Sequence, residues 1–219
     1  QQKIAVSSPT RSPWIDANGW RILRKPGVQY LYDVPGSRAA LSAAEAFTYE
    51  ADAIVKLESG ELEEFGAMVR FLKGLPSTTM APAIDLILID EGSTATGEVM
   101  NLLTRRNLFY LLDTKPSPLY PLTLKLGTRE FPYDDAADPS AFTQKIRKRI
   151  GDENRNLRLF GSEVVIGRMQ SDGLTTRLHL LNYGGMEIDG LRVRVLGKFS
   201  GASYQVPGEA KKKIEDEDR

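Results

Sequence analysis

The sequence predicts an α/β fold, in which a parallel-sheet layer is followed by a small C-terminal antiparallel β-sandwich. Short apolar stretches begin at residues 28, 53, 83 and 108 and alternate with helical patterns, which is the repeat of β-α-β units with right-handed crossovers. After Gly151 the pattern changes to strands of alternating hydrophobicity, separated by glycine-containing turns. These two observations define the fold class.

The chain is expected to divide where the pattern changes. We expect an N-terminal arm over residues 1–27, an α/β domain over 28–153, a β-sandwich over 154–208 and a charged tail over 209–219. The arm contains a turn-rich stretch of serine and proline, which favours irregular structure. The tail has a basic cluster followed by an acidic one, which is typical of a solvated segment or an exposed loop.

Apolar runs and helical spacing define the elements of the α/β domain. Six alanines favour a helix over residues 37–51, and the apolar residues of 61–73 recur at helical spacing before Gly74. The run at 83–89 is the most hydrophobic strand. The expected strands are 28–33, 53–57, 83–89 and 108–112, and the expected helices are 37–51, 61–73 and 97–107.

A further helix is predicted after Asp138, which can cap its first turn, with Pro139 at the first helical position. One of its faces is apolar. The other face is basic, and it is expected to be either solvated or a site for a phosphate or a partner. The apolar face holds Phe142, Ile146 and Ile150, and the basic face holds Lys145, Arg147, Lys148 and Arg149.

The β-sandwich is expected to contain four short antiparallel strands, 157–160, 163–169, 175–183 and 191–199. In the last of them, valines alternate with Arg192 and Arg194, so that one face is apolar and the other is basic. Four strands make a thin sandwich. It is therefore expected to borrow a strand from the N-terminal arm or to be completed beyond Arg219.

The composition excludes several kinds of site. The 219 residues contain no cysteine, which excludes disulfides, cysteine nucleophiles and cysteine-ligated metals, and a single histidine excludes a multi-histidine metal site. Basic and acidic residues number 29 each, so a broad nucleic-acid-binding surface is not expected. No apolar stretch approaches the ~18 residues that span a membrane. No cofactor is expected, and the absence of cysteine and of an initiator methionine favours a periplasmic or secreted location.

The third strand is expected to deliver a polar loop to the carboxyl edge of the sheet, where parallel sheets bind their ligands. Gly92 and Gly97 bracket four residues in this loop, as in a phosphate-binding loop. Glu98 stands where such loops carry a lysine, and its charge would repel a phosphate. A nucleotide site is therefore not expected here.

Three carboxylates at the same edge, Asp90, Glu91 and Glu98, are candidate catalytic residues. Paired carboxylates act in glycoside hydrolysis, and carboxylates also bind divalent cations. Alternatively, these acids favour the N-terminus of the following helix through its dipole, while a threonine of its first turn caps it. This structural interpretation is favoured, and no metal site is predicted. Arg105 and Arg106 follow on the helix as candidate ligand-binding residues.

Aromatic residues and the single histidine complete the candidates. His179 lies on an alternating strand, and because the sequence has no G-x-S-x-G turn, it is expected to be a half-exposed strand residue. Trp14 and Trp20 have the flat surfaces on which sugars stack, and they are candidate ligand-binding residues. Tyr30 and Tyr32 belong to the same group of aromatics, for which core packing is the alternative.

Two stretches resemble known families. Residues 53–74, a short strand followed by ELEEFGAMVRFLKG, resemble the strand-and-helix unit of class I glutamine amidotransferase-like domains, among them the trimerisation-like domain of some β-galactosidases. Residues 177–197, RLHLLNYGGMEIDGLRVRVLG, resemble the small β-sandwich that closes many glycoside hydrolases. The resemblance implies a flavodoxin-like or amidotransferase-like layer and accessory domains from a carbohydrate-active setting. The cysteine nucleophile and the catalytic barrel of these families have no counterpart here, so their activities do not carry over.

We therefore expect a non-catalytic, carbohydrate-associated binding or assembly module. Its partners would be a carbohydrate ligand, a second copy of the chain or a larger glycosidase assembly, whereas nucleic acid and membranes are not expected. The alternative is a small glycoside hydrolase, or another hydrolase, that uses Asp90, Glu91 or Glu98. A third hypothesis is a scaffold whose surface docks a partner.

Overall fold

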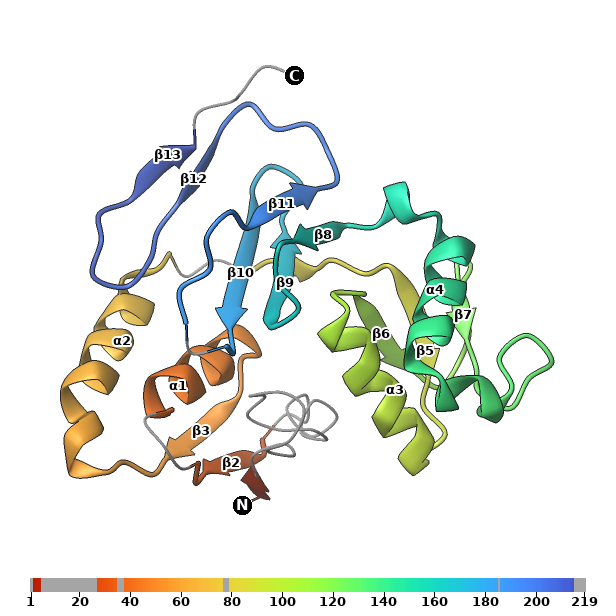
Figure 1. Ribbon diagram of the computed structural model, residues 1–219, viewed down its shortest axis with the longest axis horizontal. Helices are drawn as coiled ribbons and strands as arrows, with labels where there is room; N and C mark the ends of the chain where they lie inside the picture. Colours follow the sequence, from red (N-terminus) through yellow and green to blue (C-terminus); the bar gives the residue numbers. More distant parts are fainter. Residues whose placement is uncertain (1, 5–26, 35–37, 77–78, 185, 215–219) are drawn as a thin grey trace.

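A computed structural model describes residues 2–4, 27–34, 38–76, 79–184 and 186–214, which form mixed helices and strands (Figure 1). Two sheets are parallel and have three strands each. The other sheets are small and antiparallel. This arrangement is compatible with the predicted α/β class.

The first parallel sheet has the strand order β1-β2-β3, and helix α1 packs against β3 and against helix α2. Its core also contains Ile166, Leu181 and Tyr183 from the later part of the chain. This core therefore draws on both the predicted α/β domain and the predicted sandwich. The elements are β1 (Gln2–Ile4), β2 (Gln29–Tyr32), α1 (Ala39–Thr48), β3 (Asp52–Val55), the 3₁₀ turn η2 (Ser59–Glu61) and α2 (Leu62–Gly74).

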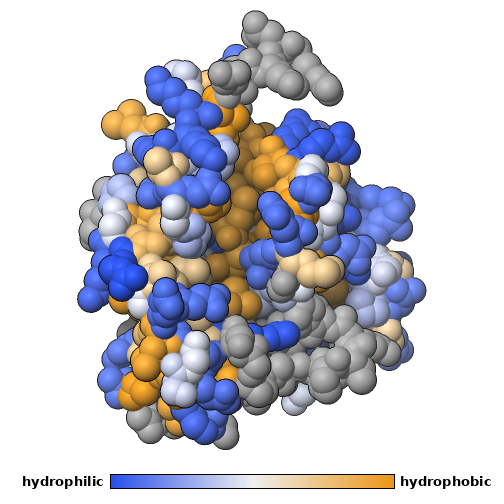
Figure 2. All heavy atoms as spheres, turned by 60° about the vertical axis from the view of Figure 1, so that its left-hand side comes forward, coloured by the Kyte–Doolittle hydropathy of each residue, from blue (hydrophilic) through white to orange (hydrophobic). Residues whose placement is uncertain are grey.

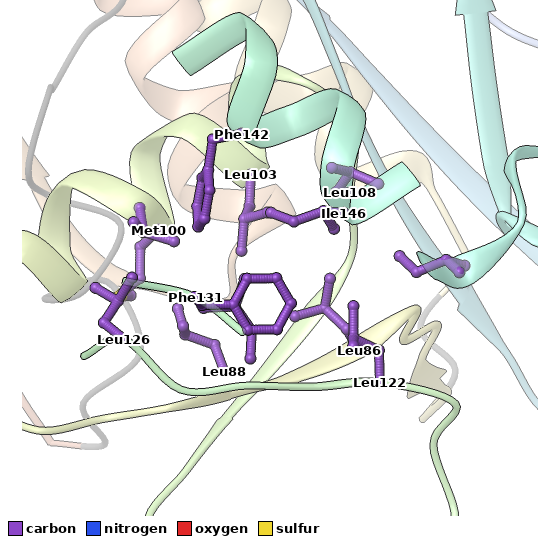
Figure 3. Close-up of a cluster of buried hydrophobic side chains, with 13 residues drawn as sticks. Leu86, Leu88, Met100, Leu103, Leu108, Leu122, Leu126, Phe131, Phe142 and Ile146 are labelled. Carbon is purple, nitrogen blue, oxygen red and sulfur yellow. The ribbon is translucent and has the colours of Figure 1, made fainter. Parts of the chain in front are cut away.

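The second parallel sheet has the order β6-β5-β7, and helices α3 and α4 pack on it through buried apolar side chains (Figure 3). Phe131 lies among these side chains, edge-on to Phe142, with 6.1 Å between the ring centroids. The elements are β5 (Leu86–Ile89), α3 (Thr94–Arg105), β6 (Tyr110–Asp113), β7 (Thr123–Leu124), the 3₁₀ turn η3 (Tyr133–Ala137) and α4 (Pro139–Ile150).

The antiparallel sheets have the strand orders β10-β9-β4, β11-β8 and β12-β13. The longest of their strands, β9 and β10, pair over seven residues each. The elements are β4 (Ala81–Pro82), the 3₁₀ turn η4 (Asp152–Asn154), β8 (Leu157–Phe160), β9 (Val165–Ser171), β10 (Thr176–Asn182), β11 (Arg192–Val195), β12 (Ala202–Tyr204) and β13 (Lys212–Ile214).

The predicted single parallel layer is divided in the structure. Of its four strands, β2 and β3 lie in the first sheet, and β5 and β6 lie in the second. Each pair takes its third strand from a segment that the sequence did not mark as a strand: β1 comes from the arm predicted to be irregular, and β7 is only two residues long. Most of the arm lies outside the described residues.

The sandwich prediction is corrected in a similar way. All four predicted strands form, as β8 to β11, but they pair in two separate sheets, and β9 takes β4 from the α/β part as a further partner. Part of the predicted solvated tail, Lys212–Ile214, forms β13 and pairs with β12. Local patterns give the strands, whereas pairing depends on segments far apart in the sequence.

The helix starts follow from their caps. As predicted, Asp138 begins α4: its Oδ1 accepts hydrogen bonds from the backbone N–H groups of Ser140 and Ala141, each at 3.0 Å. α3 begins at Thr94, earlier than predicted, because Ser93 caps it by accepting a hydrogen bond from the N–H of Thr96 at 3.1 Å. The cap is thus a serine, and not one of the threonines that the sequence favoured.

A buried carboxylate joins the early and late parts of the chain. Glu45 of α1 is 1% exposed, and its two oxygens accept hydrogen bonds from the phenols of Tyr32, at 2.9 Å, and Tyr183, at 2.5 Å. Burial, and then the charge of Glu45, raises the pKa of Tyr183 well above 10. The two donors offset the cost of burying the carboxylate.

Asn107 joins the second sheet to β9. Its side-chain Nδ2 donates to the carbonyl of Val165 at 3.0 Å, and its Oδ1 accepts from the N–H of Gly167 at 2.7 Å. Its φ of 53° is a left-handed conformation, which asparagine tolerates better than most residues. At Gly167, a Cβ atom would overlap Cδ2 of the fully buried Leu157, so any larger residue here would force the Leu157 side chain to shift.

The close packing of Gly167 against Leu157 predicts an effect on stability. Gly167→Ala should lower the free energy of unfolding by about 1–3 kcal/mol, because the fully buried Leu157 would have to shift within the core. The matched control is Gly66→Ala in the interior of α2, where a Cβ meets only Arg70 Nη1 at an ordinary 3.4 Å. That change should stabilise the protein by roughly 0.5–1 kcal/mol. Urea unfolding of both variants measures the difference, and equal effects in the two would contradict the packing argument.

Candidate functional site

The carboxyl ends of β5 and β6 lie side by side, because the N–H of Asp90 donates to the carbonyl of Asp113 at 2.8 Å. Asp90 Oδ1 accepts from the N–H of Gly92 at 2.8 Å, within a turn in which Gly92 has a φ of 73°. Asp113 Oδ1 likewise accepts from the N–H groups of Thr114, at 2.6 Å, and Lys115, at 3.2 Å. Both aspartates therefore close turns of their own loops.

Glu91 connects its loop to two later segments. Its Oε2 accepts a hydrogen bond from the phenol of Tyr133 at 3.1 Å, and its Oε1 lies 3.5 Å from Lys125 Nζ, directly after β7. The hydrogen bond, followed by the charge of Glu91, raises the pKa of Tyr133. The site at this edge thus gathers groups from the loops after all three strands of the sheet.

Three further candidates, Glu98, Arg105 and Arg106, lie on α3 or at its end. α3 has 12 residues, so it is about 18 Å long, and Arg105 and Arg106 lie at its far end. Glu98 lies on the exposed side of α3, beyond its first turn. The first turn of α3 contains no acidic residue, so the dipole argument does not apply to Glu98.

Sequence reasoning missed three residues of this edge. Asp113 follows the predicted strand 108–112, so the rule that ligands lie at the carboxyl ends of strands could have found it. Lys125 and Tyr133 had no such signal, because β7 is too short to show a pattern.

Two hollows among the described residues, of about 60 and 120 Å³, are not lined by Asp90, Glu91 or Glu98, so they assign no ligand to this edge. In the part of the chain that the structure describes, no group of three or more His, Asp or Glu side chains could hold a metal ion. The contacts at this edge favour a structural role that joins the loops.

The aromatic candidates have different positions. Tyr30 and Tyr32 are 1% and 0% exposed and belong to the first core, so they are not available to stack on a sugar. Trp14 and Trp20 lie outside the described residues.

His179 lies on β10, opposite Arg168 of β9, and its ring centroid is 5.8 Å from that of Phe47. It is partly buried, as the sequence predicts for a strand histidine. Burial, and then the charges of Arg177 and Arg168, lowers its pKa to about 4, while Glu50 acts in the opposite sense. At neutral pH the imidazole is therefore uncharged.

Comparisons with models of protein families, with curated proteins and with solved structures find no match to this chain. Of the helices that the structure describes, none is long and apolar enough to cross a membrane.

The lowered pKa of His179 predicts acid-sensitive stability. Its ordinary pKa is 6.5, so between pH 6.5 and about 4 the unfolded chain binds the proton more readily. The stabilisation is complete above pH 6.5 and is lost as the pH falls through that range, by up to about 3 kcal/mol before solvent screening reduces it. His179→Gln should remove this slope. Urea midpoints measured from pH 7 to pH 5 test this cleanly, because the chain has one histidine; equal slopes in wild type and variant would refute it.

Proposed function

We propose that this chain is a non-catalytic assembly module that docks onto a second copy of itself through its C-terminal residues. The observation that carries the proposal is that every residue from Leu196 to Ile214 is exposed, although this segment contains two paired strands. We call residues 196–214 the C-terminal ribbon.

The ribbon has two unlike faces. Directly opposed residues of an antiparallel pair share a face, so Ala202 with Ile214, and Tyr204 with Lys212, project to one side. Ser203 and Lys213, which are opposed to each other, project to the other side. A two-stranded ribbon alone is marginally stable in water, so the exposed Tyr204 and Ile214 on the face that also carries Lys212 favour a partner surface that covers them.

Apolar side chains remain exposed throughout this part of the chain. Figure 2 shows the side of the molecule on which α2 and the ribbon come forward, with apolar atoms gathered in a hollow between hydrophilic rims. From residue 160 onwards, the large apolar side chains left exposed are Phe160, Leu174, Leu180, Met186, Val193, Leu196, Phe199, Tyr204, Val206 and Ile214.

A second copy of the chain is the partner that we propose, because its net charge of zero leaves no overall repulsion between two chains.

The carbohydrate-active setting, the larger glycosidase assembly and the periplasmic or secreted location stay predictions of the sequence. The hydrolase alternative has less support, because the Asp90 carboxylate closes a turn of its own loop and the Glu91 carboxylate joins its loop to Tyr133. Melting curves with a panel of sugars would test the carbohydrate prediction separately, since a bound ligand raises the melting temperature.

The assembly proposal predicts a sedimentation mass that is a multiple of 24.3 kDa and that falls on dilution. The double variant Tyr204→Ser, Ile214→Ser should weaken association by about tenfold or more, because it removes two exposed apolar side chains from one face. The circular dichroism spectrum should be unchanged, since neither residue is in a buried core cluster.

The matched control is Leu174→Ser, which removes a 98% exposed leucine from the turn between β9 and β10. It should leave the mass unchanged. A wild-type monomer at the highest attainable concentration would refute the proposal, and so would equal weakening by both sets of changes.

A further inference from the structure

Arginine side chains from several elements converge on a single aspartate. Arg155 Nη1 donates to Asp152 Oδ1 at 2.9 Å, and Arg158 Nη1 donates to Asp152 Oδ2 at 3.1 Å. Arg147 Nε lies 4.0 Å from Asp152 Oδ1. Together with two nearby arginines, these side chains form what we call the arginine cluster: Arg106, Arg147, Arg155, Arg158 and Arg194.

The fold fixes the position of this cluster. Arg106 is the C-cap of α3, Arg147 lies in the last turn of α4, and Asp152 belongs to η4. Figure 1 shows β8, which carries Arg158, between the C-terminal end of α4 and β11. Three parts of the chain that are distant in the sequence, the end of α3, the segment from α4 to β8, and β11, thus meet at one place.

Arg155 has a structural task within the cluster. Its side chain is 5% exposed, and its Nη2 donates to the carbonyls of Arg106, at 3.1 Å, and Asn107, at 3.2 Å. It thereby satisfies carbonyls at the end of α3, and Asp152 is its ion-pair partner. This structural role accounts for the presence of Arg155 and Asp152, but it does not account for the other four arginines of the cluster.

The charges do not balance. Among the described residues, three of the five arginines contact Asp152, and the buried Asp85 interacts with Arg155, so that five positive charges are set against two carboxylates. The C-terminal ends of α3 and α4 add about half a negative charge each. Roughly two positive charges therefore remain uncompensated.

Three further observations point the same way. Burial, and then the charges of Arg155 and Arg106, lowers the pKa of Arg147, while Asp152 opposes this effect. Arg194 of β11 lies directly opposite Arg158 of β8, an arrangement of like charges that destabilises a strand pair. Within the described residues, the buried Nε atoms of Arg147 and Arg155 have no hydrogen-bond partner.

We propose that the arginine cluster is a binding site for a phosphate or sulfate group. The planar guanidinium fork matches the oxygens of such a group, and several arginines together supply the donors and the charge. Asp152 is 46% and Arg147 38% exposed, so an anion can approach from solvent. The proposal is independent of the assembly proposal, since none of these residues belongs to the C-terminal ribbon.

The test is calorimetric titration with inorganic phosphate and with inorganic sulfate, at constant ionic strength set with sodium chloride. Binding should be saturable, and a repeat of the titration at a higher fixed concentration of sodium chloride should show weaker binding. Arg158→Gln and Arg147→Gln should each weaken binding by about tenfold or more, because each removes a charged donor. The matched control is Arg149→Gln, on the same helix, whose partner is Glu130 outside the cluster; it should leave binding unchanged.

A second variant tests the role of the aspartate. Asp152→Asn removes the negative charge that competes with the ligand, so it should tighten binding several-fold. Titration with glucose 6-phosphate, with glucose as control, distinguishes a site for a phosphate ester from one for the free ion. No saturable binding of any of the anions would overturn the proposal, as would equal losses in Arg158→Gln and Arg149→Gln.

Discussion

The structure depends on satisfying both hydrogen-bonding edges of β9. Pairing with β10 satisfies one edge along its whole length. At the other edge, β4 pairs with the end of the strand, and the N–H of Ala83 donates to the carbonyl of Met169. Further along this edge, the Asn107 side chain forms hydrogen bonds with the backbone of Val165 and Gly167. Unsatisfied backbone groups buried at this edge would be costly. Asn107 follows α3, which packs on the second parallel sheet, and Ile166 of β9 packs in the core of the first parallel sheet. The hydrogen bonds at this edge of β9 therefore connect the two parallel sheets.

A second polar junction orients the residues that follow α4. Asp85, before β5, is 2% exposed and accepts hydrogen bonds from the N–H and Nδ2 of Asn156, at 2.9 and 2.7 Å, and from the N–H of Phe109, at 2.8 Å. Burial raises its pKa, and the hydrogen bonds oppose this rise. Asn156 is thereby held against β5, and the neighbouring Arg155 against the end of α3. The arginine cluster is therefore organised by contacts that the fold needs in any case.

The sequence was sufficient for features that depend on local chemistry. It predicted α4 from Asp138 and the apolar stripe, and the strands from short apolar runs. It could not predict which strands share a sheet, because that depends on β1 and on the two-residue β7, neither of which has a pattern. At the candidate site, Asp90 and Glu91 are at the predicted edge, but Arg105 is separated from them by the length of α3. Because each helical residue adds a fixed rise along the axis, the length of the expected helix could already have shown that Arg105 lies far from Asp90 and Glu91.

The arginines show why a charge pattern has to be judged in three dimensions. Each basic face, on α4 and on the last predicted strand, is adequately explained by solvation when it is considered alone. A solvated face needs no counter-ion, because water screens each charge separately. Once the fold brings Arg147, Arg158 and the nearly buried Arg155 to the same carboxylate, screening is reduced and repulsion between them has to be offset. One aspartate offsets only part of it, so an anionic ligand is the component that would complete the electrostatics of this cluster.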